Sequence, residues 1–221
     1  MIRHLFLRLF VIAGLTAPLT PQMAHADPIT IEHEHGTLKL DAPAKRIAVT
    51  NWATTETVIA LGLDPVAIAD PDDYLDWVAK PDLPENMEAL RAAKPDLIVI
   101  SKNLEMAYDS FNAIAPTIVL SVYNNNRDAL PEAQKLFETL AKATDRQAEA
   151  KAWLDDADVK FAEYGDRVRA AMPPGRALAI TQFVSESHIG LYGKSSLPGT
   201  VLAQMDLPLA YQGPVNNWGF A

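Results

Sequence analysis

The sequence contains no cysteine, and positive charge is scarce. Without cysteine the chain has to fold on its apolar core alone, with no disulfide bond, and it offers no thiol for a lipid anchor. Its 19 Lys and Arg face 28 Asp and Glu, which gives a net charge of −9. A nucleic-acid partner is not expected, since such binders are normally basic, and an anionic ligand would need local positive groups. With 221 residues, 49% of them hydrophobic, the chain suits one or two globular domains.

Long apolar runs are also missing, apart from one at the N-terminus. Residues 5–19 form an apolar run that Arg3 precedes and Arg8 interrupts, and Ala24-His25-Ala26 follows. The run is shorter than the roughly 20 residues that a membrane span needs. Residues 1–26 are therefore interpreted as a secretory signal peptide that is cleaved after Ala26, with a membrane anchor as the alternative.

Sequence motifs of the common enzyme classes are absent. The chain has no G-x-S-x-G, no P-loop, no G-x-G-x-x-G and no H-E-x-x-H. His188 stands beside Ser185 and Ser187, but neighbours along one strand do not make a catalytic triad. We therefore expect a protein that is not an enzyme and that carries no cofactor, and an α/β hydrolase has no motif in its favour.

The first half of the chain alternates strand and helix patterns. Residues 29–40 read as strand, turn and strand around Gly36, and residues 47–51 as a short buried strand. A helix is expected after an N-cap at Thr54, ending at Gly62, and a further strand over residues 65–69. The pattern then repeats, with helices over residues 88–94 and 105–115 and strands over 97–101 and 117–121. This alternation predicts an α/β lobe with a mostly parallel sheet.

The second half begins with a long stretch that contains little Gly or Pro. Apolar residues at steps of three and four predict helices over residues 130–144 and 145–172. Residues 177–183 and 188–193 read as strands of a second α/β segment, and residues 200–205 as a helix. The expected organisation is a signal peptide (1–26), an N-terminal α/β lobe (27–144), an inter-lobe helix (145–172) and a partial C-terminal α/β lobe (173–221). The fold class is thus α/β, with two Rossmann-like lobes joined by a long helix and the second lobe incomplete.

Three segments carry a resemblance to a known family: KRIAVTNWATTETVIALGLDPVAIAD, KPDLIVIS and SSLPGTVLAQMDLPLAYQGPVNNWG. In this order they resemble the periplasmic substrate-binding proteins of iron–siderophore ABC importers, in particular the ferrichrome and hydroxamate branch. The EHGTLKL opening is also similar to the ferric-citrate branch. The resemblance implies two α/β lobes on a rigid helix, with the iron complex in a shallow cleft between them. It also implies delivery of that complex from the periplasm to an inner-membrane ABC permease, by a protein that we expect to be a monomer.

The sequence departs from the family in the stretch before Glu88. Family members carry a short strand and a ligand-contacting Arg there, whereas Met87 leads directly into the helix. Arg91 on that helix is a candidate substitute, with a solvated helix face as the alternative. Leu104 stands where the family has a ligand-contacting Tyr, and Tyr108 lies one helical turn further on.

Tryptophans supply the candidate ligand site. Trp52, Trp77 and Trp218 match cleft positions of the family, and Tyr74 is near enough in sequence to share the wall of Trp77. Indoles at strand ends would give a chelate flat contact area at low entropic cost. The alternative is that each Trp belongs to the core.

Acidic residues and histidines suggest further roles. The resemblance gives Glu56 a role in docking to the permease, with a solvated carboxylate as the alternative, and Glu186 is a weaker candidate for the same role. His33 and His35 fall on one face of the predicted strand, but two imidazoles without a third ligand favour a surface strand over a metal site. We therefore predict no metal site.

The leading hypothesis is periplasmic capture of an iron(III)–siderophore complex, of the hydroxamate type, and its delivery to an ABC importer. The alternatives are another chelate, such as ferric citrate, haem or a corrinoid, or a truncated copy that no longer binds.

Overall fold

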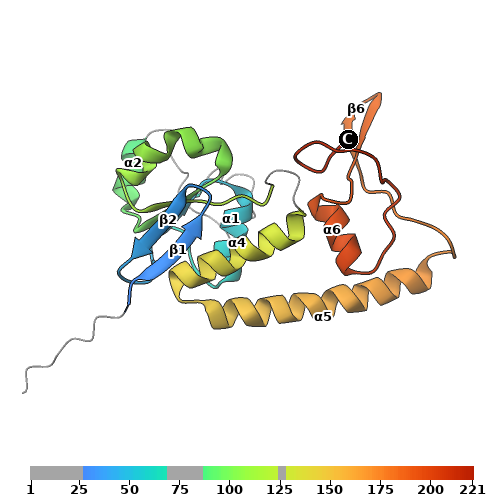
Figure 1. Cartoon of the computed structure of the whole chain (residues 1–221), viewed down its shortest axis with the longest axis horizontal. Helices are drawn as coiled ribbons and strands as arrows, with labels where there is room; N and C mark the ends of the chain where they lie inside the picture. Colours follow the sequence, from blue (N-terminus) through green and yellow to red (C-terminus); the bar gives the residue numbers. More distant parts are fainter. Residues whose placement is uncertain (1–26, 69–86, 124–127) are drawn as a thin grey trace, which may run out of the picture.

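The computed structural model describes residues 27–68, 87–123 and 128–221 (Figure 1). The proposed signal peptide and both Tyr74 and Trp77 lie outside these ranges. The chain is a mixed α/β protein, as predicted, in which a long helix, α5 (Gln147–Ala171), runs beneath both a larger N-terminal part and a smaller C-terminal part. No helix in the described ranges is both long and apolar enough to cross a bilayer.

A parallel three-stranded sheet forms the centre of the N-terminal part. Its strands are β3 (Ile47–Val49), β4 (Leu97–Ile100) and β5 (Thr117–Val119), in the order β3-β4-β5. The strand expected over residues 65–69 appears as a single parallel bridge between Ala48 and Ala67. The predicted parallel sheet is therefore confirmed, and all three strands point their carboxyl ends toward one edge.

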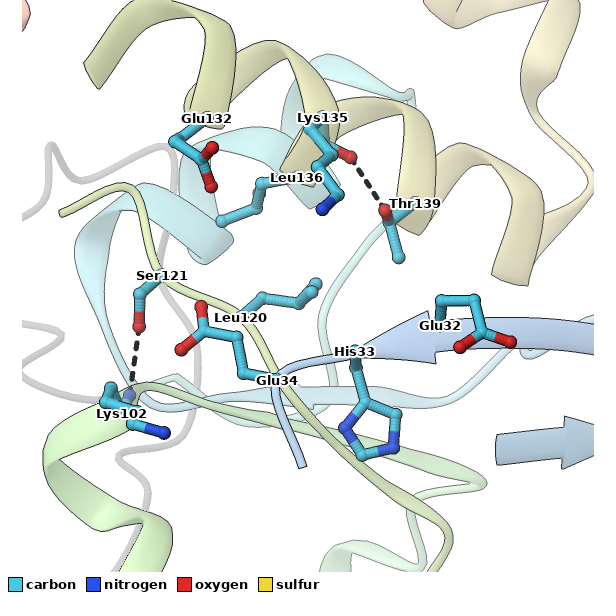
Figure 2. Close-up of a pocket in the computed structure, with 10 residues that line it drawn as sticks. All are labelled: Glu32, His33, Glu34, Lys102, Leu120, Ser121, Glu132, Lys135, Leu136 and Thr139. Atoms are coloured by element: carbon cyan, nitrogen blue, oxygen red, sulfur yellow. Dashed lines mark hydrogen bonds between the residues drawn. The ribbon is translucent and has the colours of Figure 1, made fainter. Parts of the chain in front are cut away.

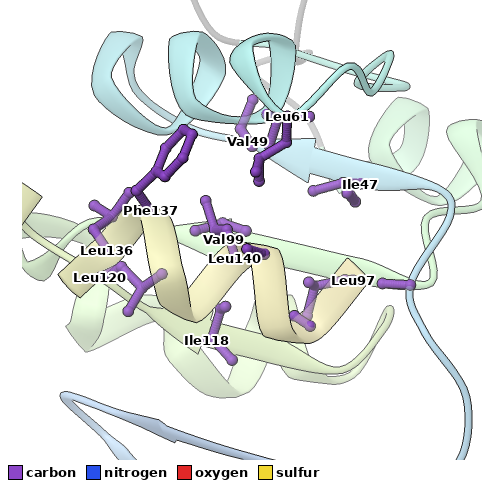
Figure 3. Close-up of a cluster of buried hydrophobic side chains, with 14 of the residues drawn as sticks. Ile47, Val49, Leu61, Leu97, Val99, Ile118, Leu120, Leu136, Phe137 and Leu140 are labelled. Carbon is purple, nitrogen blue, oxygen red and sulfur yellow. The ribbon is translucent and has the colours of Figure 1, made fainter. Parts of the chain in front are cut away.

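Helices cover both faces of this sheet. Side chains alternate along each strand, so that Val49, Val99 and Ile118 face one core and Ile98 and Val119 the other. The first core lies under α1 (Trp52–Ala60) and α4 (Ala129–Thr144) (Figure 3). The second core lies under α2 (Met87–Ala93) and α3 (Tyr108–Asn112).

A β-hairpin extends the first core. Strands β1 (Ile29–His33) and β2 (Gly36–Leu40) pair antiparallel, and Ile31 and Leu40 are buried. The backbone N–H of Glu34, just after β1, donates to the carbonyl of Val119 at 3.1 Å. The hairpin is thereby fixed to the carboxyl end of β5.

The start of α1 differs from the prediction. The N-cap is Asn51, whose Oδ1 accepts from the Thr54 backbone N–H at 3.1 Å, and not Thr54 itself. Thr54 is fully buried, and its hydroxyl donates to the Asn51 carbonyl at 3.0 Å. The helix therefore begins at Trp52, three residues earlier than a Thr54 cap would set it.

The helix expected over residues 105–115 is divided. A 3₁₀-helix, η3 (Lys102–Ala107), precedes the short α3. In a 3₁₀ turn, residues three apart eclipse each other, which places Glu105 directly over Lys102. That ion pair, at 2.7 Å, accompanies the tighter winding.

The helix α5 (Gln147–Ala171) lies where residues 145–172 were expected to be helical, and it is mostly exposed. Only Ala150 and Gly165 are buried along it. Ion pairs four residues apart line its surface, for example Lys151 with Asp155 at 2.7 Å. Its packing is therefore confined to a few points: near its start the Trp153 ring lies 5.1 Å from that of Phe137 on α4.

The C-terminal part differs from a parallel α/β unit. It holds α6 (Leu197–Gln204) and a hairpin in which β6 (Thr181–Ser185) pairs antiparallel with β7 (His188–Leu191). A two-residue turn joins the two strands, which permits only antiparallel pairing. Every residue of β6 is exposed, so this hairpin contributes little to any core.

Candidate functional site

A cavity lies at the edge where the three parallel strands end. The segments after β3, β4 and β5 meet there, which is where open α/β sheets place their ligands. Its volume is about 230 Å³, and Trp218 from the C-terminal part closes one side. The lining residues are Asn51, Trp52, Ala53, Ser101, Lys102, Asn103, Leu120, Ser121, Val122, Tyr123, Leu136 and Trp218.

Aromatic side chains form one wall of this cavity. The rings of Tyr123 and Trp218 lie 5.4 Å apart at a tilt of 57°. Trp52 is 52% exposed and Trp218 is 63% exposed, so neither belongs to the core. The structure thus brings two of the predicted tryptophans to one cavity, whereas Trp77 and Tyr74 lie outside the described residues.

Local capping holds each tryptophan in place. Trp52 is the first residue of α1, and the buried Thr54 turns the other side of that helix inward. Trp218 sits in a turn closed by Asn216, whose Oδ1 accepts from the backbone N–H of Trp218 at 2.9 Å and of Phe220 at 3.1 Å. Both indoles therefore remain at the rim without being buried.

Sequence reasoning did not single out Tyr123. This residue is half-buried, and burial raises the pKa of its phenol, so it stays neutral at physiological pH. The sequence did contain a signal for it, because Tyr123 follows the predicted strand at residues 117–121 and so falls at the same edge of the sheet as Trp52.

The other wall consists mainly of short polar side chains. The Ser101 hydroxyl is hydrogen-bonded to Asn103, and the backbone N–H of Lys102 donates to Ser121 Oγ at 3.0 Å. The described lining contains no Asp, Glu or His that would serve as a general base. Apolar faces combined with a few polar groups suit reversible binding of a small molecule.

A second cavity adjoins the first (Figure 2). It has a volume of about 380 Å³ and shares Lys102, Leu120, Ser121 and Leu136 with the aromatic cavity. Its remaining lining is polar and half acidic, made of Glu32, His33, Glu34, Glu132, Lys135 and Thr139. The aromatic cavity thus borders a region rich in carboxylates.

Glu105 links Lys102, which lines both cavities, to His35 in the turn of the β1–β2 hairpin. Its Oε2 lies 2.7 Å from Lys102 Nζ, and its Oε1 lies 3.1 Å from His35 Nδ1. The hydrogen bond with Glu105 raises the pKa of Lys102, and the same bond lowers the pKa of the Glu105 carboxyl. Both groups therefore stay charged at neutral pH.

The two histidines are not arranged as metal ligands. His33 ends β1, whereas His35 lies in the turn after it, so the two do not share a strand face as predicted. His33 Nδ1 accepts from the Val119 backbone N–H at 3.2 Å, and the His35 ring stacks on Tyr108 at 4.1 Å. Across the described residues, no group of three or more His, Cys, Asp or Glu is placed to hold a metal ion.

The remaining candidates do not line the aromatic cavity. Arg91 is exposed on α2, and Leu104 packs against the second core from η3. Glu56 is exposed on α1, and Glu186 occupies the turn between β6 and β7. His188 Nδ1 is hydrogen-bonded to Ser187 Oγ at 2.9 Å on the exposed β6–β7 hairpin.

Comparison with known proteins gives one family match and several relatives. A family model described as periplasmic binding protein matches residues 47–214. The iron(3+)-hydroxamate-binding protein FhuD of Escherichia coli is 28% identical over 190 residues, which cover 79% of this chain and 62% of that protein. The Fe(3+) dicitrate-binding periplasmic protein FecB of the same organism is 28% identical, over 92% of this chain and 69% of that protein.

A solved structure shows the same fold. The siderophore-binding protein FhuD from Vibrio cholerae, with Fe3+–Desferal bound, matches with a TM-score of 0.72 at 28% identity. The match covers 80% of this chain and 71% of that one. This chain thus spans 62% of the length of the Escherichia coli FhuD, which is less than two thirds of that protein.

Proposed function

Since this chain belongs to the periplasmic binding protein family, we propose that it captures an iron(III)–siderophore complex in the periplasm and delivers it to an inner-membrane ABC importer. The sequence resemblance to the siderophore-binding members is confirmed by the relatives and by the structural match. We further propose that the ligand is of the hydroxamate type and that the protein performs no chemistry on it.

The observation that carries the proposal is the aromatic cavity at the carboxyl ends of β3, β4 and β5. Tyr123 comes from the N-terminal part and Trp218 from the C-terminal part, so a ligand there touches both. A siderophore wraps its iron in alkyl carbons and amide edges, and flat rings contact such a surface over a large area. Ser101, Asn103 and Ser121 add polar groups that orient the ligand.

The proposal is tested by titrating the protein with ferrichrome, the iron complex of desferrioxamine, and ferric dicitrate while following tryptophan fluorescence. We expect saturable quenching. Trp218→Ala should weaken chelate binding by about tenfold, because it removes one face of the cavity. Trp153→Phe is the matched control, since Trp153 packs on Phe137 and does not line this cavity.

Two results would count against the proposal. Absence of quenching by every chelate, with a circular dichroism spectrum of a folded α/β protein, would favour the alternative that this chain does not bind a chelate. Equal effects of Trp218→Ala and Trp153→Phe would remove the aromatic cavity as the binding site. A second candidate ligand, ferric citrate, is favoured by the similarity to the dicitrate-binding relative, and the same titration ranks it.

A further inference from the structure

Lys102 is the charged side chain that a ligand in the aromatic cavity would meet. Among the described residues that line this cavity, it alone carries a formal charge. It begins η3, which Ser101 separates from β4, and its backbone N–H donates to Ser121 Oγ at 3.0 Å, so the segments after β4 and β5 fix its place. Its side chain is half exposed and reaches into both cavities.

The Lys102 ammonium does not make the site positive. The Glu105 carboxylate contacts it at 2.7 Å, and the charge of Glu34 acts on it as well. Figure 2 shows Glu34 and Lys102 on the same side of the adjoining cavity. One ammonium thus faces two carboxylates.

The wider surroundings of the site are also negatively charged. The adjoining cavity adds Glu32 and Glu132 against one further cation, Lys135. The whole chain carries a net charge of −9. A ligand that enters the aromatic cavity therefore approaches through a negative field, and each negative charge on the ligand makes its binding less favourable.

We propose that Glu105 and Glu34 make this site select iron chelates by charge, so that neutral or positively charged chelates bind and net-anionic chelates are disfavoured. This inference rests on the proposed function. Lys102 keeps two ammonium protons beyond the one that Glu105 accepts, so it can still donate to chelate oxygens. The lysine supplies hydrogen bonds, and the carboxylates cancel the attraction that it would otherwise exert on an anion.

The test compares three iron(III) chelates of different charge. The desferrioxamine complex is positively charged through its free amine, ferrichrome is neutral, and ferric dicitrate is anionic. For the wild-type protein we expect the dissociation constant to rise along this series. Glu105→Gln should strengthen dicitrate binding by about three- to tenfold and change ferrichrome binding by less than about twofold, because one nearby charge disappears while a hydrogen-bonding side chain remains.

Two further variants sharpen the result. Lys102→Met should weaken dicitrate binding more than ferrichrome binding. Glu138→Gln is the matched control, because it makes the same charge change at an exposed position of α4 outside both cavities. The readout is the ratio of dicitrate affinity to ferrichrome affinity. A general loss of folded protein would lower both apparent affinities equally and leave this ratio unchanged.

The outcomes separate this inference from the proposed function. If the wild-type protein binds none of the chelates, the proposed function itself fails. If it binds them, but the ratio of dicitrate to ferrichrome affinity is the same in Glu105→Gln as in Glu138→Gln, the protein is a chelate binder and the proposed charge selection is wrong. Tighter binding of dicitrate than of ferrichrome by the wild-type protein would overturn the charge selection as well.

Discussion

Gly165 on α5 is one of the points at which the C-terminal part is attached, besides the contact of α6 with α4, and its replacement by alanine tests the attachment to α5. A Cβ atom there would lie 2.2 Å from the carbonyl oxygen of Met205, at the end of α6. Beside it, Arg169 Nη1 donates to the carbonyls of Met205 at 2.6 Å and Asp206 at 2.9 Å. These contacts hold the end of α6 against α5.

Two effects of Gly165→Ala oppose each other. In an exposed helix, alanine is more favourable than glycine by about 1 kcal/mol. At this contact the methyl group meets backbone atoms, which cannot rotate away, and overpacking of this kind costs about 1–3 kcal/mol. Displacing α6 also weakens the two hydrogen bonds of Arg169, each worth about 1.5 kcal/mol or more to a charged donor. The net expectation is destabilisation by about 1–3 kcal/mol.

The assay is urea denaturation followed by circular dichroism and by tryptophan fluorescence. Glu163→Ala, at an exposed position on the same helix, is the control and should change the midpoint little. A Gly165→Ala protein that is more stable than wild type, by the amount expected for an exposed helix position, would refute the contact between α5 and α6.

Two more predictions concern docking and pH. Glu56→Gln should lower chelate transfer to permease-containing vesicles by about tenfold and leave chelate affinity unchanged, as expected of a rim charge that meets a basic partner. Equal transfer by Glu56→Gln and by the control Glu138→Gln would exclude a docking role for Glu56. Burial, followed by the charge of His35, lowers the pKa of His33 from its usual 6.5, so the unfolded chain binds a proton more readily than the folded one. The stability that the neutral His33 ring contributes should therefore be complete above about pH 6.5 and fall as the pH drops below it. The measurement is the urea midpoint of wild type and His33→Asn between about pH 7.5 and pH 5.5. An equal fall of the midpoint in both proteins would contradict this expectation.

The N-terminal lobe was largely predictable because its signals are local and periodic. Short apolar runs separated by amphipathic helices predicted the parallel sheet, and α4 matches the helix predicted at residues 130–144 almost to the residue. The helix start at Asn51 was missed because Asn51, Thr54 and Thr55 are all good capping residues. Only the burial of both threonines, a tertiary effect, makes Asn51 the cap.

The C-terminal part and the site were less predictable. Residues 177–193 have strand-like composition, but their antiparallel pairing depends on the two-residue turn, and their exposure depends on what packs nearby. The ion pair of Lys102 with Glu105 lies in a 3₁₀-helix, whereas the expected helix began only at residue 105 and did not include Lys102. The neighbourhood of Tyr123 and Trp218 joins residues far apart in sequence, and no local pattern encodes such a contact.

The sparse packing of α5 makes the placement of the C-terminal part sensitive to the angle of one helix. The helix is anchored near Ala150 and carries α6 at Gly165, a span of roughly 22 Å at about 1.5 Å per residue. A tilt of about 5° at the anchored end would move the far end by roughly 2 Å. That displacement is a sizeable fraction of the 5.4 Å between the Tyr123 and Trp218 rings. The distance between the two rings therefore depends on the angle that α5 keeps, together with the contact of α6 with α4, where the backbone N–H of Leu130 donates to Thr200 Oγ1 at 3.1 Å.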